Sequence, residues 1–438
     1  MNFLEEQLFF LKTLKNKMRT VGALLPTSQA AARVMVSECA RHSGPKRVLE
    51  VGAGTGAITR EIVKHIGPND ALVCVELEPE FVDYLQRRFQ TEPEFERVRG
   101  RTQIKHMSVL DVPADESAEK FDFIISAIPF NNCAPEFVRA VFAHYQKLLT
   151  PRGVLSYIEY IGGRYARLTL AHSAQIQGVH DVVAHEMGAY KFRQDTVWRN
   201  LPSAWVHQLR FGSVDAAYAE TLQPLTATNR IALPNSDYGA DTAVVPFVAA
   251  LGGLALLLKK LAPKTRGWWL PVLAAPAITF LFSDPVRRTP KNPALAYACA
   301  DGEVLRVERV RDERLGAGEW LRIAVLSSML DVPVNRAPLA GIVTDVICDE
   351  GDGRVEQFTM IEGTQNKCVV AQRVGFFAKR IVNRANIGDV LAQGEKFGLI
   401  YFGSCVDVYV PAEIFMPTVR AGERVVGGET VIAVTAST

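Results

Sequence analysis

Residues 47–56 read RVLEVGAGTG, an apolar run that passes directly into a glycine-rich turn. The run has the composition of a buried strand, and a helical pattern begins after the turn. Gly52, Gly54 and Gly56 allow the backbone to turn tightly and to approach a ligand with no side chain in between. This order predicts a βαβ unit that binds a nucleotide-containing cofactor, although dinucleotide-binding folds use a related glycine pattern.

Three acidic residues favour S-adenosylmethionine over a dinucleotide as the cofactor. Glu50 precedes the first glycine, where it could hold the amino or hydroxyl groups of the cofactor. Glu76 ends the second predicted strand, in LVCVELEPEF, and is placed for the two ribose hydroxyls. Asp111 follows the third strand, in SVLDVP, where the adenine amino group would lie. Each acid by itself could cap a helix instead, but the three together in this order favour the cofactor site.

The alternation of strands and helices continues to about residue 210, which predicts an open Rossmann-like α/β domain over residues 1–210. Residues 1–20 carry leucines at helical spacing and a basic opposite side. They predict an amphipathic helix that either packs on this domain or contacts a membrane surface. The predicted strands are Arg47–Val51, Ala71–Glu76, 102–105, Phe121–Ser126 and 153–160.

These motifs resemble class I methyltransferases, and more narrowly the bacterial phospholipid N-methyltransferases and the related ribosomal RNA adenine dimethyltransferases. The likeness covers roughly residues 10–205 and includes MRTVGALLPTS at 18–28. RNA adenine enzymes carry an Asn-Pro-Pro-Tyr-type loop after the fourth strand, whereas residues 126–132 read SAIPFNN. The missing Asn and aromatic hydroxyl favour a lipid amine as the methyl acceptor. The predicted cofactor-binding residues are Glu50, Gly52, Gly54, Gly56, Glu76, Asp111 and Ser126.

The following strand carries Tyr157, Glu159 and Tyr160, which are candidates to line the acceptor amine. An aromatic ring would assist as the amine becomes a quaternary cation. The same residues could equally be core and edge residues of the sheet, and the sequence leaves this open.

Residues 211–242 lose periodicity and gain Thr, Asn, Pro and Gly, which predicts a linker. Two apolar stretches follow at 243–258 and 267–282, each about 16 residues long, shorter than the ~20 residues of a spanning helix. Basic residues lie between the stretches and after the second one, so two full spans would place one basic group on the translocated side. We predict a hairpin over 243–282 that dips into one leaflet, with Trp268 and Trp269 at the headgroups. The alternative is a buried helical hairpin of a soluble core.

Short strands and glycine-rich turns dominate after residue 298, which predicts a mainly-β domain over 283–438. Residues 398–411, GLIYFGSCVDVYVP, resemble the Phe-Gly-Ser-Arg-Val-Asp-Val-Tyr signature of short phosphatidylserine decarboxylases. Four further motifs occur in the family's order: SDPVRRTP at 283–290, ADG at 300–302, DVPVNRAP at 331–338 and VGFFAKRIV at 374–382.

This resemblance implies that the chain cuts itself. Ser404 would attack the carbonyl of Gly403, the ester would undergo elimination, and the fragment 404–438 would begin with a pyruvoyl group. That ketone would condense with the amine of phosphatidylserine and act as the electron sink when carbon dioxide leaves.

The C-terminal domain departs from the family pattern in two places. All eight histidines lie at or before residue 207, and Pro333 stands where the family has a histidine. Cys405 replaces the arginine that follows the serine. The remaining candidates for a catalytic base or orienting group are Asp301, Asp331 and Asp407.

The composition bears on the kinds of partner, metal site and disulfide that the chain could have. The net charge of +2 gives no argument for a nucleic-acid partner, and seven scattered cysteines without a CxxC pair predict neither structural zinc nor disulfides. The N-terminus lacks the features of a signal peptide. We predict a bifunctional phospholipid enzyme at the cytoplasmic face of the inner membrane that uses S-adenosylmethionine and a pyruvoyl group from Ser404. Its partners would be phosphatidylserine and phosphatidylethanolamine, with homo-oligomers possible. The alternatives are a phospholipid methyltransferase with a non-cleaving, lipid-binding C-terminal domain, and a membrane-tethered RNA adenine methyltransferase.

Overall fold

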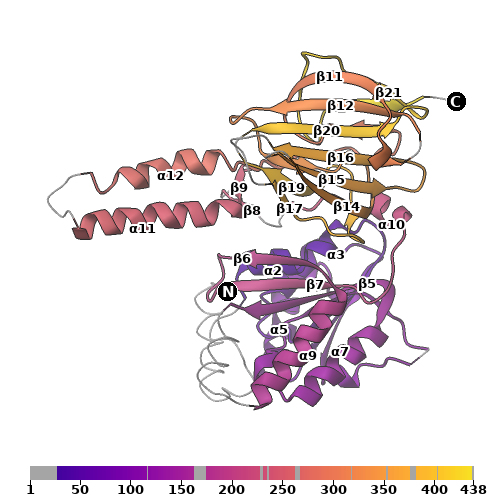
Figure 1. Cartoon of the computed structure of the whole chain (residues 1–438). Helices are drawn as coiled ribbons and strands as arrows, with labels where there is room; N and C mark the ends of the chain where they lie inside the picture. Colours follow the sequence, from indigo (N-terminus) through magenta and orange to yellow (C-terminus); the bar gives the residue numbers. More distant parts are fainter. Residues whose placement is uncertain are drawn as a thin grey trace. The chain divides into compact units, whose positions relative to one another are not determined.

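The computed structural model describes residues 27–115, 117–161, 174–226, 230–233, 236–261, 267–316, 318–351, 354–374, 381–401 and 403–436. The amphipathic helix predicted for residues 1–20 lies outside these residues. The chain divides into two compact units, Met1–Val214 and Asp215–Thr438 (Figure 1).

The first unit is built on a seven-stranded sheet in the order β3-β2-β1-β4-β5-β7-β6. The first five strands in the chain are parallel, and β7 runs antiparallel to both of its neighbours. The Rossmann-like fold predicted for this half is therefore confirmed. The strands are β1 (Arg47–Val51), β2 (Ala71–Glu76), β3 (Thr102–His106), β4 (Phe121–Ser126), β5 (Leu149–Tyr160), β6 (Lys191–Val197) and β7 (Ala204–Leu209).

Helices cover both faces of this sheet. One face packs against residues of α2, α4 and α5, such as Met35, Ile62 and Leu85, and the other packs against residues of α7 and α9, such as Phe142 and Val182. Burial on both faces explains why the central strands are nearly continuous apolar runs. The helices are α2 (Gln29–Met35), α3 (Ser37–Arg41), α4 (Thr59–Ile62), α5 (Pro79–Thr91), α6 (Pro93–Glu96), α7 (Pro135–Leu148) and α9 (Ala174–Tyr190).

The linker predicted for residues 211–242 is wrong from Asp215 onward. Asp215 caps helix α10 (Ala216–Thr221) by accepting a hydrogen bond from the Tyr218 backbone, and Tyr218 is buried. Strands β8 (Arg230–Ala232) and β9 (Gly239–Asp241) then pair with each other. These elements are only three to six residues long, so they are too short to produce a hydrophobic period in the sequence.

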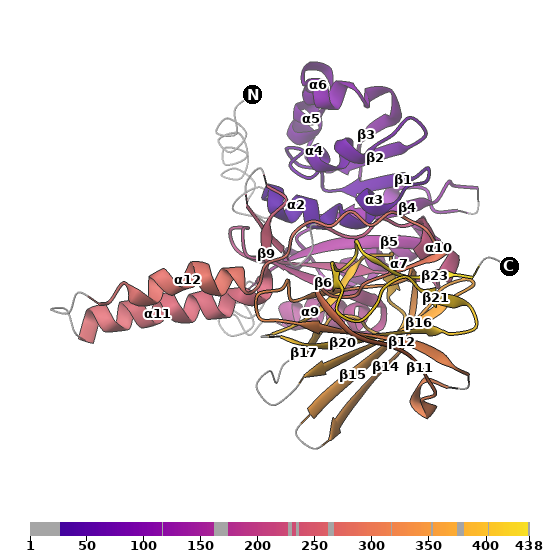
Figure 2. The ribbon, with the colours of Figure 1, turned by 90° about the horizontal axis from the view of Figure 1, so that it is seen from above.

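The predicted hairpin consists of α11 (Val245–Leu261) and α12 (Leu270–Phe280), which lie side by side and project from the β strands (Figures 1 and 2). Among the described residues of these two helices, only Ala255 is buried, which argues against a hairpin buried in a soluble core. Thr242–Leu261 is long and apolar enough to span a membrane by length and composition, with a mean hydropathy of 1.9.

Both ends of the hairpin are anchored on the β domain. Phe282 is buried against Tyr401, with ring centroids 5.1 Å apart. Asp241, which precedes α11, is fully buried and accepts hydrogen bonds from Arg384 at 2.6 and 2.7 Å. Asp284, which follows α12, accepts a hydrogen bond of 2.6 Å from the Lys396 ammonium.

The rest of the second unit is mainly β, as predicted. An eight-stranded sheet has the order β18-β14-β15-β16-β20-β12-β11-β22, and two three-stranded sheets have the orders β13-β19-β17 and β10-β23-β21. Val304, Ile323 and Val408 of the large sheet share one buried core with Phe397 and Ile432 of the small sheets.

The strands of this unit are β10 (Leu295–Tyr297), β11 (Gly302–Val310), β12 (Trp320–Ser327), β13 (Val334–Arg336), β14 (Gly341–Gly351), β15 (Arg354–Glu362), β16 (Lys367–Val374), β17 (Ile381–Asn383), β18 (Val390–Leu391), β19 (Lys396–Ile400), β20 (Ser404–Pro411), β21 (Phe415–Pro417), β22 (Arg424–Val425) and β23 (Val431–Thr435).

Candidate active sites

The glycine-rich turn lies at the point where the strand order of the first sheet reverses. Val51 at the end of β1 is in register with Ser126 at the end of β4. In open α/β sheets, ligands bind outside the carboxyl ends of the strands at such a point. Gly52, Gly54 and Gly56 all have positive φ angles, of 75°, 54° and 83°, a conformation that only glycine adopts at little cost.

Glu76 holds this turn in place. One carboxylate oxygen accepts a hydrogen bond of 2.8 Å from the Gly54 backbone, and the other accepts bonds from Leu77 at 2.8 Å and Glu78 at 3.1 Å. Glu76 therefore lies where the sequence placed it, beside the turn and at the end of β2. The same contacts mean that it also fixes the shape of the turn, which the sequence did not reveal.

Glu50 is buried behind the turn, with 1% of its surface exposed. Its Oε2 accepts hydrogen bonds from Thr59 Oγ1 at 2.7 Å and from Cys74 Sγ at 3.4 Å. Its Oε1 has no hydrogen-bond partner among the described residues. Burial raises the pKa of this carboxyl to about 7. A buried carboxylate oxygen without a partner fits the ammonium group of S-adenosylmethionine, so the residues of this crevice fit that cofactor.

The surroundings of Ser126 and Asp111 differ from those of Glu50 and Glu76 beside the glycine-rich turn. Ser126 is fully buried, and its hydroxyl accepts a hydrogen bond of 2.8 Å from the Tyr145 hydroxyl of α7. This hydroxyl is therefore engaged with a core tyrosine, and a contact between Ser126 and the cofactor stays a prediction. Asp111 is exposed in the short 3-10 helix Val109–Asp111 that follows β3, on the side of the sheet predicted for adenine.

Arg88 is a residue of this site that the sequence reasoning missed. It lies on α5 with 2% of its surface exposed, and its guanidinium donates a hydrogen bond of 2.6 Å to the Thr55 carbonyl of the glycine-rich turn. Two further bonds of 2.8 and 2.9 Å join it to the Glu92 carboxylate. A Cβ on Gly56 would come within 3.1 Å of the guanidinium. An arginine among the buried positions of amphipathic α5 and a glutamate four residues later, at the end of the helix, were the available signal.

The loop after β4 rests on a layer of buried rings. Phe130 is 1% exposed, and its ring lies 4.9 Å from that of Tyr157. Tyr157 is in turn stacked on His207 at 6.0 Å, and Nε2 of His207 lies 3.2 Å from the Glu159 carboxylate. Tyr157 and Glu159 are thus buried residues of the sheet, which agrees with the core alternative, and Tyr160 is only partly exposed.

The second site is the turn that enters β20. Ser404 is in register with Ser327 on the neighbouring strand β12. Gly403 has a φ of 81°, and a Cβ there would come within 3.0 Å of the Ser327 carbonyl oxygen. The Gly403–Ser404 peptide therefore lies in a tight turn that a larger residue at 403 would strain.

A small cavity of about 10 Å³, enough for roughly one water molecule, adjoins Gly403 and is also lined by Pro333, Asp331 and Asn335. The position at which the family has a histidine is therefore next to the turn. Proline cannot take a proton at that place, so the departure noted in the sequence falls at the site itself.

Asp301 and Asp331 lie near this turn in different electrostatic settings. Asp331 accepts hydrogen bonds from the Ser328 backbone at 2.8 Å and from Arg424 at 2.5 Å. Burial opposes its ionisation, but these bonds outweigh burial and lower the pKa of Asp331. Burial raises the pKa of Asp301, although Arg287 donates to its carboxylate at 2.8 Å. The Asp301 carbonyl accepts a hydrogen bond from the Ser327 hydroxyl.

Asp407 was predicted as a possible base or orienting group, and its contacts favour a structural role. Asp407 is fully buried, and its carboxylate accepts a hydrogen bond of 2.8 Å from Arg322 and another from Arg373. Cys405 shares the face of Asp407 and donates its thiol to that carboxylate at 3.3 Å, and burial raises the pKa of the Cys405 thiol to about 12.

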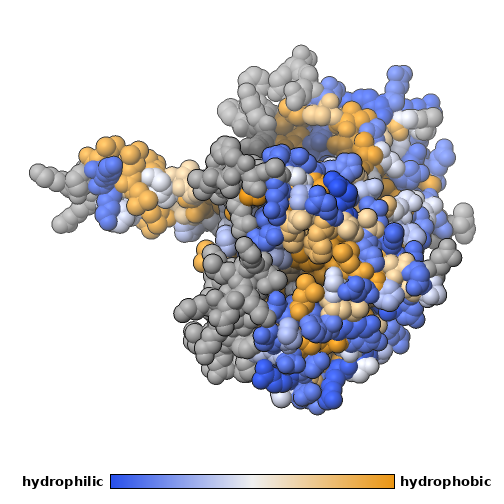
Figure 3. Space-filling model, turned by 90° about the horizontal axis from the view of Figure 1, so that it is seen from below, coloured by the Kyte–Doolittle hydropathy of each residue, from blue (hydrophilic) through white to orange (hydrophobic). Residues whose placement is uncertain are grey.

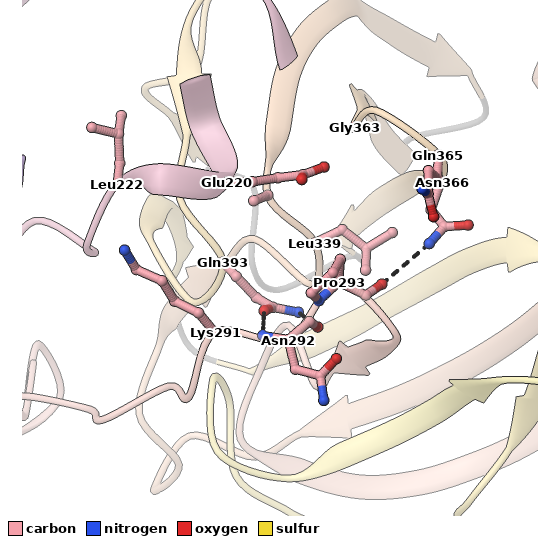
Figure 4. Close-up of a pocket in the computed structure, with 11 residues that line it drawn as sticks. Glu220, Leu222, Lys291, Asn292, Pro293, Leu339, Gly363, Gln365, Asn366 and Gln393 are labelled. Carbon is pink, nitrogen blue, oxygen red and sulfur yellow. Dashed lines mark hydrogen bonds between the residues drawn. The ribbon is translucent and has the colours of Figure 1, made fainter. Parts of the chain in front are cut away.

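A further cavity of about 30 Å³ lies beside α10 and has no residue in common with either site (Figure 4). Glu220 and Lys291 line it, together with Asn292 and Gln393. Glu220 accepts a hydrogen bond from the Thr364 backbone at 3.2 Å, which joins α10 to the β domain. Its size suits one or two water molecules.

Comparisons with known proteins match the two units separately. A family model described as a methyltransferase domain matches residues 48–153, and one described as phosphatidylserine decarboxylase matches residues 276–433. Similar solved structures include an O-methyltransferase, TomG, from Streptomyces achromogenes in complex with SAM. It is 14% identical with a TM-score of 0.35, and the match covers 48% of this chain and 90% of that one.

The curated relatives match the C-terminal half. The phosphatidylserine decarboxylase proenzyme of Symbiobacterium thermophilum is 36% identical over 202 residues, which cover 43% of this chain and 91% of that protein. The proenzyme of the same name from Geobacter metallireducens is 36% identical over 203 residues, which cover 43% and 92%. The chain belongs, through its C-terminal half, to the phosphatidylserine decarboxylase family, and it carries a methyltransferase domain before that half.

Proposed function

We propose that this chain carries out two successive steps on one phospholipid headgroup. The second unit would decarboxylate phosphatidylserine to phosphatidylethanolamine after cleavage between Gly403 and Ser404. The first unit would then transfer methyl groups from S-adenosylmethionine to the amine produced. The observation that carries this proposal is the tight Gly403–Ser404 turn in a C-terminal half that is 36% identical to a decarboxylase proenzyme over 202 residues.

The pyruvoyl group would form at residue 404 and would supply the electron sink for loss of carbon dioxide. The residues around the turn would have to move protons without a histidine. Asp301 is the better proton acceptor of the two nearby acids, because burial raises its pKa. Asp331 has a lowered pKa and holds the Ser328 backbone. We therefore assign proton transfer to Asp301 and positioning of the 328–333 segment to Asp331.

The decarboxylase unit in the same chain supports a lipid as the methyl acceptor of the methyltransferase unit. The product of decarboxylation is a primary amine on a diacyl lipid, which is the substrate that an N-methyltransferase of lipids needs. Two enzymes attached to one membrane meet this lipid by diffusion in the same leaflet, so their shared anchor raises the encounter rate. The net charge of +2 offers no surplus for binding RNA.

The membrane anchor would be the hairpin. Exposed apolar side chains run along both helices, among them Leu256, Leu257 and Leu273, which are 72%, 50% and 64% exposed. Figure 3 shows this apolar surface on the projecting hairpin. Continuous exposed apolar area of this kind marks a membrane or protein contact. We propose that it lies in the cytoplasmic leaflet of the inner membrane.

Mass spectrometry of the purified full-length protein tests the decarboxylase half directly. We expect two fragments, 1–403 and 404–438, the smaller one lighter than its serine form by the mass of ammonia. The Ser404→Ala variant should stay intact and inactive on phosphatidylserine vesicles, whereas the neighbouring Cys405→Ala variant should still cleave. An intact wild-type chain after prolonged incubation with lipid would mean a methyltransferase joined to a lipid-binding domain, the alternative that Pro333 favours.

A further inference from the structure

A large apolar groove lies at the base of the hairpin. It has a volume of about 1010 Å³, at the upper end of the range for small-molecule sites. Val248 and Ala249 of α11 form one wall, Ala275 and Pro276 of α12 form another, and Ala240 of β9 contributes from the β domain. None of the described residues that line it carries a charge.

The groove adjoins the turn at Gly403 through residues 330–333, which follow strand β12. Leu330 and Val332 line the groove, whereas Asp331 and Pro333 line the small cavity beside Gly403. Residues 330–333 thus line the groove and the small cavity in alternation, so a single segment of backbone separates the groove from the cavity. A molecule that fills the groove can therefore place a polar group near the turn.

We propose that this groove binds an acyl chain of the diacyl phospholipid whose headgroup reacts at the Gly403–Ser404 turn. This proposal rests on the proposed decarboxylation. The groove is continuous with the exposed apolar surface of α11 and α12, so an acyl chain can pass from a leaflet into it without crossing water. The lining has no charge to pair with a peptide or a nucleotide, and the volume exceeds what a headgroup needs. The hairpin would thus act as both an anchor and the wall of a substrate site.

Tryptophan substitutions test the groove while the protein remains in its uncleaved form. In the Ser404→Ala background, Ala249→Trp and Ala275→Trp place a large ring in the groove. Ala250→Trp and Ala277→Trp are matched controls, because they lie on the same helices but do not line the groove. Each protein is purified in detergent with dioleoyl phosphatidylserine, and the lipid bound per chain is measured by native mass spectrometry.

We expect one lipid to bind to the parent and to both controls, with affinity for the two groove variants reduced roughly ten-fold or more, since displacing two methylenes has this effect. Equal binding by all four variants would overturn the proposal. A lipid-free dimer that the groove variants break would also overturn it, because the occupant would then be a second copy of the chain. Because lipid binding is measured on the uncleaved protein, this result tests the groove even if the protein has no decarboxylase activity.

In a cleaving background, glycerophosphoserine, which has no acyl chain, gives a second readout. The groove variants should raise the KM for dioleoyl phosphatidylserine relative to the controls and leave the KM for glycerophosphoserine unchanged. An equal rise for both substrates would indicate a general disturbance of the site and would contradict an acyl-chain groove.

Discussion

The substitution Glu50→Gln separates the structural and functional effects of a buried acid. The Glu50 carboxyl is 1% exposed, and burial raises its pKa from 4.5 to about 7. An acid whose pKa is raised on folding binds more protons in the folded state than in the unfolded state. The folded domain therefore loses stability as pH rises from about 4.5 to about 7, and the loss is complete above this window.

The magnitude follows from the shift of about 2.5 between the two values, which corresponds to on the order of 3 kcal/mol. Glutamine has the same shape and no titration. Without cofactor, we expect Glu50→Gln to unfold at the same temperature as the wild type near pH 4.5, and roughly 6–12 °C higher at pH 8. Calorimetry of the first unit's transition, at several pH values, measures this difference.

Cofactor binding should respond in the opposite direction. The ionised carboxylate would pair with the ammonium group of S-adenosylmethionine, so wild-type affinity should rise with pH up to about 7. Loss of a charge-assisted hydrogen bond costs roughly 1.5–3 kcal/mol, so Glu50→Gln should bind the cofactor about 10- to 100-fold more weakly at pH 8 by calorimetric titration. A variant that is no more stable at pH 8 and binds the cofactor equally well would refute the reasoning on Glu50.

Four further predictions concern the two sites and the hairpin. Glu76→Gln should weaken S-adenosylmethionine binding in titration while the chain stays folded. Glu76→Ala should also lower the melting temperature, because three backbone N–H groups lose their acceptor. Equal melting temperatures of the two variants would contradict the role of Glu76 in holding the turn. Arg88→Lys should weaken cofactor binding several-fold, because a lysine cannot hydrogen-bond to Thr55 and Glu92 at the same time. The control Arg87→Lys, on the exposed side of α5, should leave cofactor binding unchanged. Equal losses of affinity in the two variants would contradict a positioning role for Arg88. Replacing residues 249–277 by a short polar loop should release the protein from vesicles in a flotation assay, and continued flotation would identify another anchor. Pro333→His should speed appearance of the 404–438 fragment on gels, and an unchanged rate would mean that the missing base is not the limiting defect.

The sequence predicted much of the fold because its signals were local. The strand, turn and helix around residues 47–56 and the long apolar runs of the parallel strands are written in consecutive residues, and the structure confirms them. The short elements at 216–241 were missed, because three to six residues do not establish a period. Their stability comes from contacts with residues far along the chain, such as Glu220 with Thr364.

By itself, the sequence determined the two domains, the glycine-rich turn, the apolar hairpin and the Gly403–Ser404 junction, since each depends on residue type and spacing along the chain. Only the tertiary structure shows what surrounds each of the predicted acids. Asp407 is close to Ser404 in sequence, yet it is fully buried and paired with two arginines. Arg88 is distant from Thr55 in sequence, yet packing of α5 brings it to the turn. The direction of a side chain and its distance from segments far along the chain are fixed only when strands pair and helices pack. Both determine the pKa of an acid and the groups that it contacts.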